Sequence, residues 1–458
     1  MDWFPTLNDR TGPFYQRIVA ALADDVAEGR LRRGQQLPTH RALAKALDLD
    51  LTTVTRAYAE ARRRGLTEAR VGQGTFVAES MAQSRHGTAP WTSFDLSMNL
   101  PPQPLDADIE GRIIRGVAAI QSESGFSELL NYREPGGTAD ERAAAGSWLQ
   151  SRIRGADGDR LVICPGTQSA LLCWLMTRAA PGDVILTESL TYPGMKAAAA
   201  VTKVRLVGVP TDDCGILPDA LRAACRRHKP KAIYLVPTMH NPTTVTMPPR
   251  RREEIAEIIR RNGLFLFEDD AYGALEPGAL PLAALIPERT YLAASLSKCM
   301  APGLRVSFVL TPDADCASSL INALRATMQM PVSLMIALVT RWLRDGSADA
   351  IVRAIKEEAA ARQKLAKQIL KAHPFAAHPN SHHIWLQLPK AWGSAEFAAH
   401  VQRQGLALAA SEHFTVSEPP PHAVRVALGA AASRHELARA LEVLATALRT
   451  SPSNVRVI

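Results

Sequence analysis

The stretch Ser295-Leu296-Ser297-Lys298-Cys299-Met300-Ala301-Pro302-Gly303-Leu304-Arg305 decides how the larger part of this chain folds. Its lysine follows an apolar, strand-like run (residues 290–294) and precedes an arginine by seven residues. A primary amine can form a Schiff base with an aldehyde, while Ser295 and Arg305 bind the phosphate of the same molecule. Pyridoxal 5′-phosphate (PLP) carries both groups. The same letters also occur in loops with a solvated lysine, so the assignment of Lys298 as the catalytic residue depends on the rest of the chain.

Short apolar runs alternate with helical patterns throughout the C-terminal three quarters of the sequence. This alternation predicts an α/β fold with a largely parallel sheet covered by helices. In such a sheet, ligands bind beyond the carboxyl ends of the strands, so the polar residues that follow each run are the candidates for a site. The runs are residues 161–164, 184–186, 204–209, 232–236, 264–267, 291–294 and 306–310.

Polar and aromatic residues do follow five of these runs. Each has an ordinary explanation when taken alone, because an Asn-Pro pair makes turns, an acid lies at a surface and a tyrosine borders a core. Five such features in order at successive strand ends are hard to explain by chance. They are Gly166, Thr167 and Gln168 after the first run, Tyr192 after the second, Asn241 after the fourth, Asp269 and Tyr272 after the fifth, and the Ser295–Arg305 stretch after the sixth.

Together these motifs resemble the fold-type-I PLP enzymes, specifically the class I aminotransferases, over roughly residues 95–448. The resemblance implies that Lys298 binds the cofactor aldehyde and that Asp269 pairs with the pyridinium nitrogen. It also implies that Tyr192 stacks on the ring and that Asn241 and Tyr272 bind the 3′ oxygen. The implied phosphate ligands are Gly166, Thr167, Gln168, Ser295 and Arg305, with Tyr132 reaching the phosphate of the partner subunit.

Two further groups lie near the C-terminus. Arg425, in Val424-Arg425-Val426-Ala427-Leu428-Gly429, matches the family arginine that binds the α-carboxylate of an amino acid, a contact suited to a planar guanidinium. His373, His378, His382 and His383 are close in sequence, and we interpret them as surface and loop histidines. No carboxylate or cysteine spacing completes a metal site, so we predict none.

The first 78 residues have a different pattern. Apolar spacing predicts a helix over residues 13–28, a second over 40–47 with Thr39 as N-cap, and a third over 51–64 between Asp50 and Gly65. Two short helices joined by a tight turn indicate a helix-turn-helix. Residues 66–70 and 75–77 then predict two strands joined by a glycine-rich turn, the wing of a winged helix.

This segment resembles the GntR family of bacterial DNA-binding domains through L-P-x-x-R, T-T-V-x-x-A-Y and G-x-G-T-F-V in order. Many GntR domains have an arginine where this chain has Leu51. We interpret Arg62, Arg63 and Arg64 as a solvated helix end, because recognition uses the N-terminal turn. Residues 1–80 hold 12 Lys and Arg against 10 Asp and Glu, so binding would depend on local patches and a dimer. The candidate DNA contacts are Thr39, Arg41, Thr52, Thr53, Thr55, Arg56 and Gly74.

Composition agrees with a cytoplasmic protein of two or three domains. The 458 residues carry a net charge of +8, which permits nucleic-acid binding without requiring it. The six cysteines form no C-x-x-C pair. No apolar run predicts a signal peptide or a membrane span, so we expect no membrane among the partners. We expect a DNA-binding domain at residues 1–79, a linker at 80–94 and a PLP domain at 95–458.

A winged helix fused to an aminotransferase-like domain resembles the MocR subfamily of GntR regulators. The resemblance implies a head-to-tail, domain-swapped homodimer that binds double-stranded operator DNA. Our first hypothesis is a PLP-dependent transcriptional regulator that senses an amino acid, an amine or PLP by Schiff-base exchange at Lys298. The alternative is an active aminotransferase with an accessory DNA-binding domain. A third possibility, a PLP fold used only for dimerisation, is opposed by the intact lysine and phosphate motifs.

Overall fold

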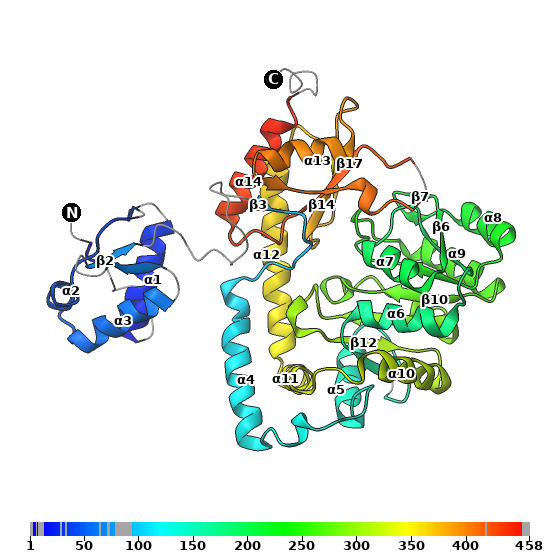
Figure 1. Ribbon diagram of the computed structural model, residues 1–458, viewed down its shortest axis with the longest axis horizontal. Helices are drawn as coiled ribbons and strands as arrows, with labels where there is room; N and C mark the ends of the chain where they lie inside the picture. Colours follow the sequence, from blue (N-terminus) through cyan, green and yellow to red (C-terminus); the bar gives the residue numbers. More distant parts are fainter. Residues whose placement is uncertain are drawn as a thin grey trace. The chain divides into compact units, whose positions relative to one another are not determined.

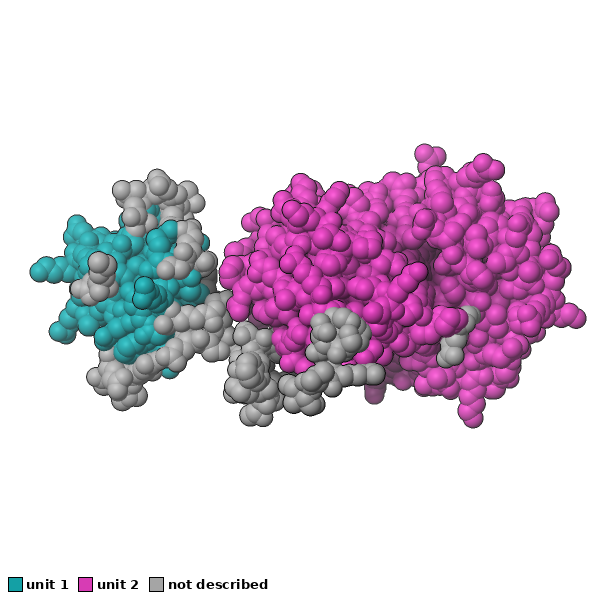
Figure 2. All heavy atoms as spheres, turned by 90° about the horizontal axis from the view of Figure 1, so that it is seen from above, with its two compact units in different colours: residues 1–90 teal, residues 91–458 magenta. Residues whose placement is uncertain are grey.

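The structure is a computed structural model, and it divides the chain into two compact units, residues 1–90 and 91–458 (Figure 2). Residues 80–93 of the expected linker (80–94), Arg64, Gly65 and the wing turn (residues 71–73) lie outside the described residues, whereas Phe94 belongs to a strand. The described residues are 3–5, 7, 13–27, 30–32, 34–63, 66–70, 74–77, 94–156, 158–416 and 419–450.

The N-terminal unit has the predicted helices and hairpin: α1 (Phe14–Ala27), α2 (His40–Leu47), α3 (Leu51–Arg63), β1 (Thr67–Arg70) and β2 (Gly74–Val77) (Figure 1). The Thr39 hydroxyl accepts a hydrogen bond from the Ala42 N–H at 3.2 Å, which confirms the predicted N-cap of α2. The strands β1 and β2 pair in antiparallel fashion, as a wing requires. Apolar faces of all three helices, including Leu22, Leu43 and Val54, form a common buried core.

A seven-stranded sheet with the order β4-β12-β11-β10-β9-β5-β6 lies at the centre of the C-terminal unit. All seven predicted runs form its strands, and only β12 runs antiparallel to its two neighbours, β4 and β11. The strands are β4 (Leu161–Cys164), β5 (Val184–Glu188), β6 (Arg205–Val209), β9 (Ala232–Leu235), β10 (Phe265–Asp269), β11 (Thr290–Ser295) and β12 (Ser307–Leu310).

Helices cover both faces of this sheet because successive side chains of each strand point to opposite faces. Tyr291 and Ala293 of β11 pack with α6, α7 and α10, whereas Leu292 and Ala294 pack on the side of α5, α11 and α12. Helices α8 and α9 cover the second face beneath β5, β9 and β10. The bounds are α4 (Ile109–Glu123), α5 (Ala139–Leu149), α6 (Thr167–Arg178), α7 (Pro193–Thr202), α8 (Pro218–His228), α9 (Pro249–Arg261), α10 (Ala314–Met328), α11 (Ser333–Arg344) and α12 (Ser347–Ile369).

A smaller lobe of the same unit contains a four-stranded antiparallel sheet with the order β13-β14-β17-β16. The long helix α12 runs between this sheet and the larger one (Figure 1). The elements of the lobe are β13 (Phe375–Ala377), β14 (His383–Gln387), α13 (Ser394–Arg403), β15 (Leu406–Ala407), β16 (Ala409–Ala410), β17 (Ala423–Ala427) and α14 (Arg434–Ala447). Strand β3 (Phe94–Asp95) pairs with β15 in parallel, so the chain enters the C-terminal unit through this lobe.

Short strands and 3₁₀ helices complete the C-terminal unit. A small hairpin, β7 (Thr211–Asp212) with β8 (Gly215–Ile216), follows β6. The 3₁₀ helices are η1 (Leu105–Ala107), η2 (Glu128–Leu130), η3 (Gly273–Leu275), η4 (Leu282–Ala284), η5 (Pro287–Arg289), η6 (Pro302–Leu304) and η7 (Ser411–His413).

Candidate functional site

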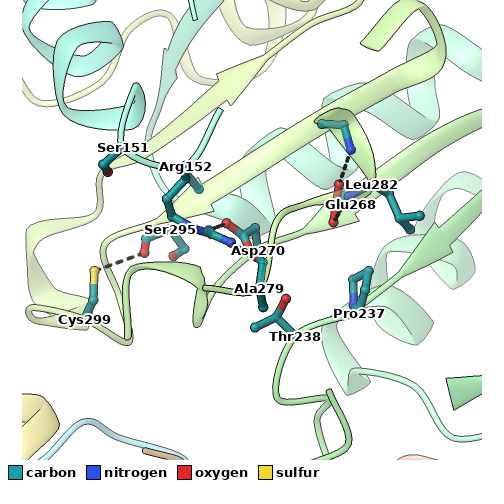
Figure 3. A network of polar contacts seen from close by, with 12 residues as sticks. Ser151, Arg152, Pro237, Thr238, Glu268, Asp270, Ala279, Leu282, Ser295 and Cys299 are labelled. Carbon is teal, nitrogen blue, oxygen red and sulfur yellow. Dashed lines mark hydrogen bonds and ion pairs between the residues drawn. The ribbon is translucent and has the colours of Figure 1, made fainter. Parts of the chain in front are cut away.

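Three consecutive acids end strand β10, and strand alternation separates their roles. Figure 3 shows Glu268 and Asp270 in one polar network, in which Arg152 forms an ion pair with Asp270. Because successive side chains of a strand point to opposite faces, Asp269 is expected on the other face. Glu268 accepts hydrogen bonds from the backbone N–H groups of Leu282 and Ala283, at 2.9 and 2.8 Å. Burial raises the pKa of Glu268 and lowers the pKa of Arg152 to about 10. This paired network leaves Asp269 as the one acid of the three on the opposite face.

Asp269 is a buried carboxylate with one oxygen already used. The Tyr234 hydroxyl donates to its Oδ2 at 2.8 Å, and within the described residues its Oδ1 has no hydrogen-bond partner. Burial raises the pKa of Asp269 to about 6, although Tyr234 and the Lys298 ammonium oppose that rise. A buried carboxylate with a free oxygen is suited to a positively charged N–H group.

Lys298 lies in the turn after β11, and its Nζ donates to the backbone oxygen of Asn99 at 2.5 Å. Burial, with the positive charge of Arg425 next in size, lowers the pKa of Lys298 to about 8, while Asp269 opposes this shift. An amine with a pKa of about 8 is deprotonated more readily near neutral pH than an exposed lysine. The structure therefore gives Lys298 the reactivity of a nucleophile.

Gly166, Thr167 and Arg305 lie at the N-terminus of α6 in an arrangement suited to an anion, and these three residues are here called the cradle. The first N–H groups of a helix have no acceptor within the helix and attract anions. Gly166 has φ +87°, and a Cβ at this position would collide with the Arg305 guanidinium, so only glycine permits this close approach. Arg305 donates to the Pro165 carbonyl at 3.1 Å and faces the helix start.

The other two predicted phosphate ligands are Ser295, at the end of β11, and Gln168, which follows Thr167 in α6. The Ser295 hydroxyl accepts a hydrogen bond from the Ser297 N–H at 3.2 Å, so its own proton remains available. The Gln168 side chain donates to the Gly194 carbonyl at 2.9 Å, which ties α6 to the start of α7. The cradle thus combines backbone N–H groups, hydroxyls and a guanidinium, a set of donors suited to phosphate.

Arg425 lies in β17 and joins the two lobes of the C-terminal unit. Its Nη1 donates to Asn241 Oδ1 at 2.8 Å, and its Nη2 donates to the Ser97 carbonyl at 2.5 Å. The guanidinium also lies over the Phe414 ring, 4.9 Å from the centroid. Because Arg425 fills the acceptor oxygen of Asn241, the amide N–H groups of Asn241 are directed elsewhere.

The tyrosines predicted for the site occupy different environments. Tyr272 is buried at the start of η3. Burial raises the pKa of its hydroxyl, and the nearby Arg425, Asp269 and Tyr192 also act on that pKa. Tyr192 is half-buried at the N-cap of α7. Tyr132 is 84% exposed, so its predicted contact with the phosphate of a partner subunit stays a prediction.

Two of the four C-terminal histidines contradict our interpretation of them as surface and loop residues. His382 and His383 are 1% and 0% exposed, because strand β14 begins at His383 and passes beneath the site. The His382 Nε2–H donates to the Lys298 carbonyl at 2.6 Å. The continuous apolar run Ile384-Trp385-Leu386 after His383 was a signal for a buried strand that the histidine cluster obscured. His373 and His378 lie outside strands and are partly exposed.

Residues 94–103, here called the arm, also contribute groups that the sequence analysis missed. The carbonyl oxygens of Ser97 and Asn99 bind Arg425 and Lys298, and the Asn99 amide donates to the Tyr272 hydroxyl at 2.5 Å. The arm is held by β3 and by the Gln103 amide, which donates to the Met300 carbonyl at 3.1 Å. Asn99 is 199 residues from Lys298 in the chain, so no local pattern indicates this contact.

The residues present fit PLP. The free Oδ1 of Asp269 suits a pyridinium N–H, the cradle at α6 suits a phosphate, and Lys298 suits an aldehyde. These three features come from β10, α6 and the turn after β11, at neighbouring strand ends of one sheet. The assignment of individual ligands remains the prediction made from the sequence.

The candidate DNA contacts lie in the N-terminal unit, most of them on its surface. Thr39, Arg41, Thr52, Thr55, Arg56 and Gly74 are exposed, and Thr53 is half-buried. The Arg56 guanidinium lies over the Tyr15 ring, 4.1 Å from the centroid, and the Thr55 hydroxyl is 3.3 Å from His40 Nδ1. Leu51, at the first position of α3, is 45% exposed on a helix end that is otherwise polar.

Comparisons with known proteins agree with this division. The family described as aminotransferase class I and II matches residues 94–444, and the gntR family of bacterial regulatory proteins matches residues 14–77. The Bacillus subtilis protein YdeF, named an HTH-type transcriptional regulator, is 29% identical over 457 residues, or 97% of this chain and 96% of its own. The HTH-type transcriptional regulator TauR of Rhodobacter capsulatus is 23% identical over 443 residues, 86% of this chain and 88% of its own.

Among solved structures, the α-aminoadipate aminotransferase LysN of Thermus thermophilus has a TM-score of 0.72 at 23% identity, and covers 78% of this chain and 92% of its own. The chain therefore belongs to the class I and II aminotransferases and carries a GntR DNA-binding domain in front of that fold. This fusion places it in the MocR subfamily of GntR transcriptional regulators. Its cofactor is PLP.

Proposed function

We propose that this transcription regulator senses a small amino compound, an amino acid, an amine or PLP itself, by Schiff-base exchange at Lys298. One observation carries the proposal. The two groups that an amino acid would engage, the amine-binding Lys298 and the carboxylate-binding Arg425, both hydrogen-bond to carbonyl oxygens of the arm. The arm follows residues 78–93, which connect it to the DNA-binding domain. A ligand that replaced these contacts would act on the segment that follows the DNA-binding domain and its linker in the sequence.

The chemistry divides between cofactor and protein. PLP, when bound, supplies an aldehyde for amines and a ring that withdraws electrons. Asp269 would hold the proton on the ring nitrogen, and the cradle at α6 would hold the phosphate. Lys298 would hold the cofactor through its aldehyde in the absence of another amine. Arg425 selects compounds that carry a carboxylate.

The proposed partners follow from the same family resemblance. Operator DNA would contact the N-terminal turn of α3, with Arg41 supporting it from α2. We also propose a cytoplasmic, head-to-tail homodimer in which Tyr132 completes the partner's phosphate site. The high exposure of Tyr132 supports this arrangement, because a side chain with that role must be available to another subunit. In the described residues, no helix is both long enough and apolar enough to cross a membrane.

An active aminotransferase is the second candidate. It is favoured by the presence of Lys298, Asp269, Tyr272 and Arg425 in one site, because these residues would support catalysis as well as sensing. The two candidate functions differ in whether DNA binding and ligand binding affect each other. A sensor changes DNA affinity when a ligand binds, whereas an enzyme with an accessory domain turns over amino and keto acids regardless of DNA.

The test is an absorbance titration of purified, PLP-loaded protein with L-amino acids, simple amines and free PLP, each with and without operator DNA. The proposal expects a saturable change in the visible band for one class of compound, with a midpoint that operator DNA shifts. Continuous release of keto acid with a DNA-independent midpoint would instead establish the aminotransferase.

A further inference from the structure

Asn99 is the polar side chain of the arm that lies deepest in the site. It is 6% exposed and contacts three different elements. Its backbone oxygen accepts from Lys298, its amide nitrogen donates to the Tyr272 hydroxyl oxygen, and the same nitrogen is 3.2 Å from His383 Nδ1. The contacts of the amide nitrogen come from separate parts of the fold, whereas the Oδ1 atom of Asn99 has no hydrogen-bond partner among the described residues.

The amide nitrogen of Asn99 carries two hydrogens, and each has an acceptor. One goes to the oxygen of Tyr272 and the other to Nδ1 of His383. His383 can accept only if Nδ1 is unprotonated. Burial, with Arg425 next in size, lowers the pKa of His383 well below its usual value, so the ring is neutral at physiological pH. A neutral imidazole carries one N–H, and with that proton on Nε2 the Nδ1 atom accepts from Asn99 and favours the amide orientation that directs an N–H group at Tyr272.

This arrangement determines where the Tyr272 proton goes. The hydroxyl oxygen already accepts from Asn99, so its own O–H is free to donate to another atom. Arg425 acts on Asn241 in the same way, by donating to Oδ1 and leaving the Asn241 N–H groups free. The family resemblance assigns Tyr272 and Asn241 to one cofactor atom, the 3′ oxygen. In both residues the oxygen already accepts a hydrogen bond from a neighbouring side chain, so the Tyr272 O–H and the Asn241 N–H groups can donate to the 3′ oxygen.

We propose that Asn99, oriented by His383, is a positioning residue that directs the Tyr272 hydroxyl proton toward the 3′ oxygen of PLP. The inference rests on the PLP site and deepens the proposed function, because Asn99 belongs to the arm. A movement of the arm would change the hydrogen bonding of the bound cofactor. Asn99 itself is not a catalytic residue, since it acts through Tyr272.

The readout is the pH midpoint of the visible band of the bound cofactor. A donor to the 3′ oxygen stabilises the negative charge that this oxygen carries in the basic form, so loss of the donor raises the midpoint. Charged and titratable groups around Tyr272 and Lys298 also influence it, namely Arg425, Asp269, Arg305, Tyr192, His382, His383 and His240. All of them are unchanged in the variants compared.

Spectrophotometric pH titration of PLP-loaded protein tests the proposal. Tyr272→Phe should raise the midpoint most, and Asn99→Ala should raise it by about 0.5 unit, the size of one hydrogen bond. In the Tyr272→Phe background, Asn99→Ala should produce no further shift, because its effect passes through the hydroxyl. Asn99→Asp, which cannot donate, should shift the midpoint at least as far as Asn99→Ala.

The matched control is Gln103→Ala, which removes a side-chain hydrogen bond between the arm and the Lys298 turn without any contact to Tyr272. Its midpoint should equal that of the wild type. An equal shift in Gln103→Ala, or a full shift of Asn99→Ala in the Tyr272→Phe background, would overturn the positioning role. Failure of the wild-type protein to show a visible band would instead refute the cofactor site itself.

Discussion

The two candidate sites of this protein differ in how their polar groups are satisfied. In the PLP site, Lys298, Asn241 and Arg425 each have a partner from a distant part of the chain. Among the candidate DNA contacts, Arg41 and Thr52 are exposed to solvent. Buried polar groups need partners inside the protein, so the fold reveals their roles. Exposed groups acquire their partners only in a complex, and the structure of the free chain leaves their roles to experiment.

The largest expected effect is on covalent cofactor binding. Lys298→Ala should abolish the PLP that borohydride reduction fixes to the protein, because the ε-amine of Lys298 is the proposed attachment point of the aldehyde. Lys196→Ala is the matched control, since burial also lowers the pKa of Lys196 but its Nζ donates to carbonyl groups at residues 412, 413 and 415. Mass spectrometry after reduction provides the measurement. A fixed cofactor in Lys298→Ala would refute the assignment.

Asp269→Asn should have opposite effects on the cofactor-free and cofactor-bound protein. The pKa of Asp269 is about 6 in the folded protein, above its usual value of 3.8, so the folded state binds more protons than the unfolded state between these values. This contribution to stability is full below pH 3.8 and is lost as pH rises through 6.

The cofactor-free Asp269→Asn protein should therefore gain on the order of 1–3 kcal/mol at pH 7 relative to wild type. It should also lose PLP more readily, because the ring nitrogen has no charged partner. Thermal unfolding at pH 4 and pH 7, with and without PLP, measures both effects. Equal stability of the two cofactor-free proteins at pH 7 would show that burial does not raise the pKa of Asp269 in the folded protein.

Arg41→Ala tests the exposed face. Loss of one phosphate contact should weaken operator binding roughly tenfold and should flatten the log–log salt dependence by about 0.9. Lys45→Ala, one turn further along the same helix and also exposed, controls for the loss of charge alone. Fluorescence anisotropy at several salt concentrations gives both quantities. If the two variants behave identically, Arg41 has no specific contact.

Leu51→Arg should change operator affinity least, and should raise it where Arg41→Ala lowers it. Leu51 is 45% exposed at the start of α3, where a new guanidinium would reach the DNA backbone without disturbing the core. Operator affinity should rise and the salt dependence should steepen by about 0.9 if one phosphate is contacted. The same titration measures it. An unchanged slope would place the start of α3 away from the phosphates.

The sequence predicted the elements better than the contacts between them. All seven strands of the large sheet and the cap at Thr39 follow from local apolar periods and local capping chemistry. Asp269 and Lys298 could be proposed as site residues because each lies at the carboxyl end of an apolar run, and their roles stay predictions. Asn99 and His383 were not, because their roles depend on an arm and a strand that meet only after folding. Local sequence patterns predict strands and helix caps, whereas the contacts of the PLP site join residues that are far apart in the chain.

Operator affinity measured across cofactor states tests the central claim most directly. The same dimeric protein is compared without PLP, with PLP, and with PLP plus each amino compound that changes the visible band, in wild type and in Arg425→Ala. The account predicts a change in operator affinity of about 5- to 150-fold between ligand states of the wild type, and a smaller change in Arg425→Ala for compounds with a carboxylate. Identical operator affinity in every state would contradict sensing and leave the aminotransferase as the better account.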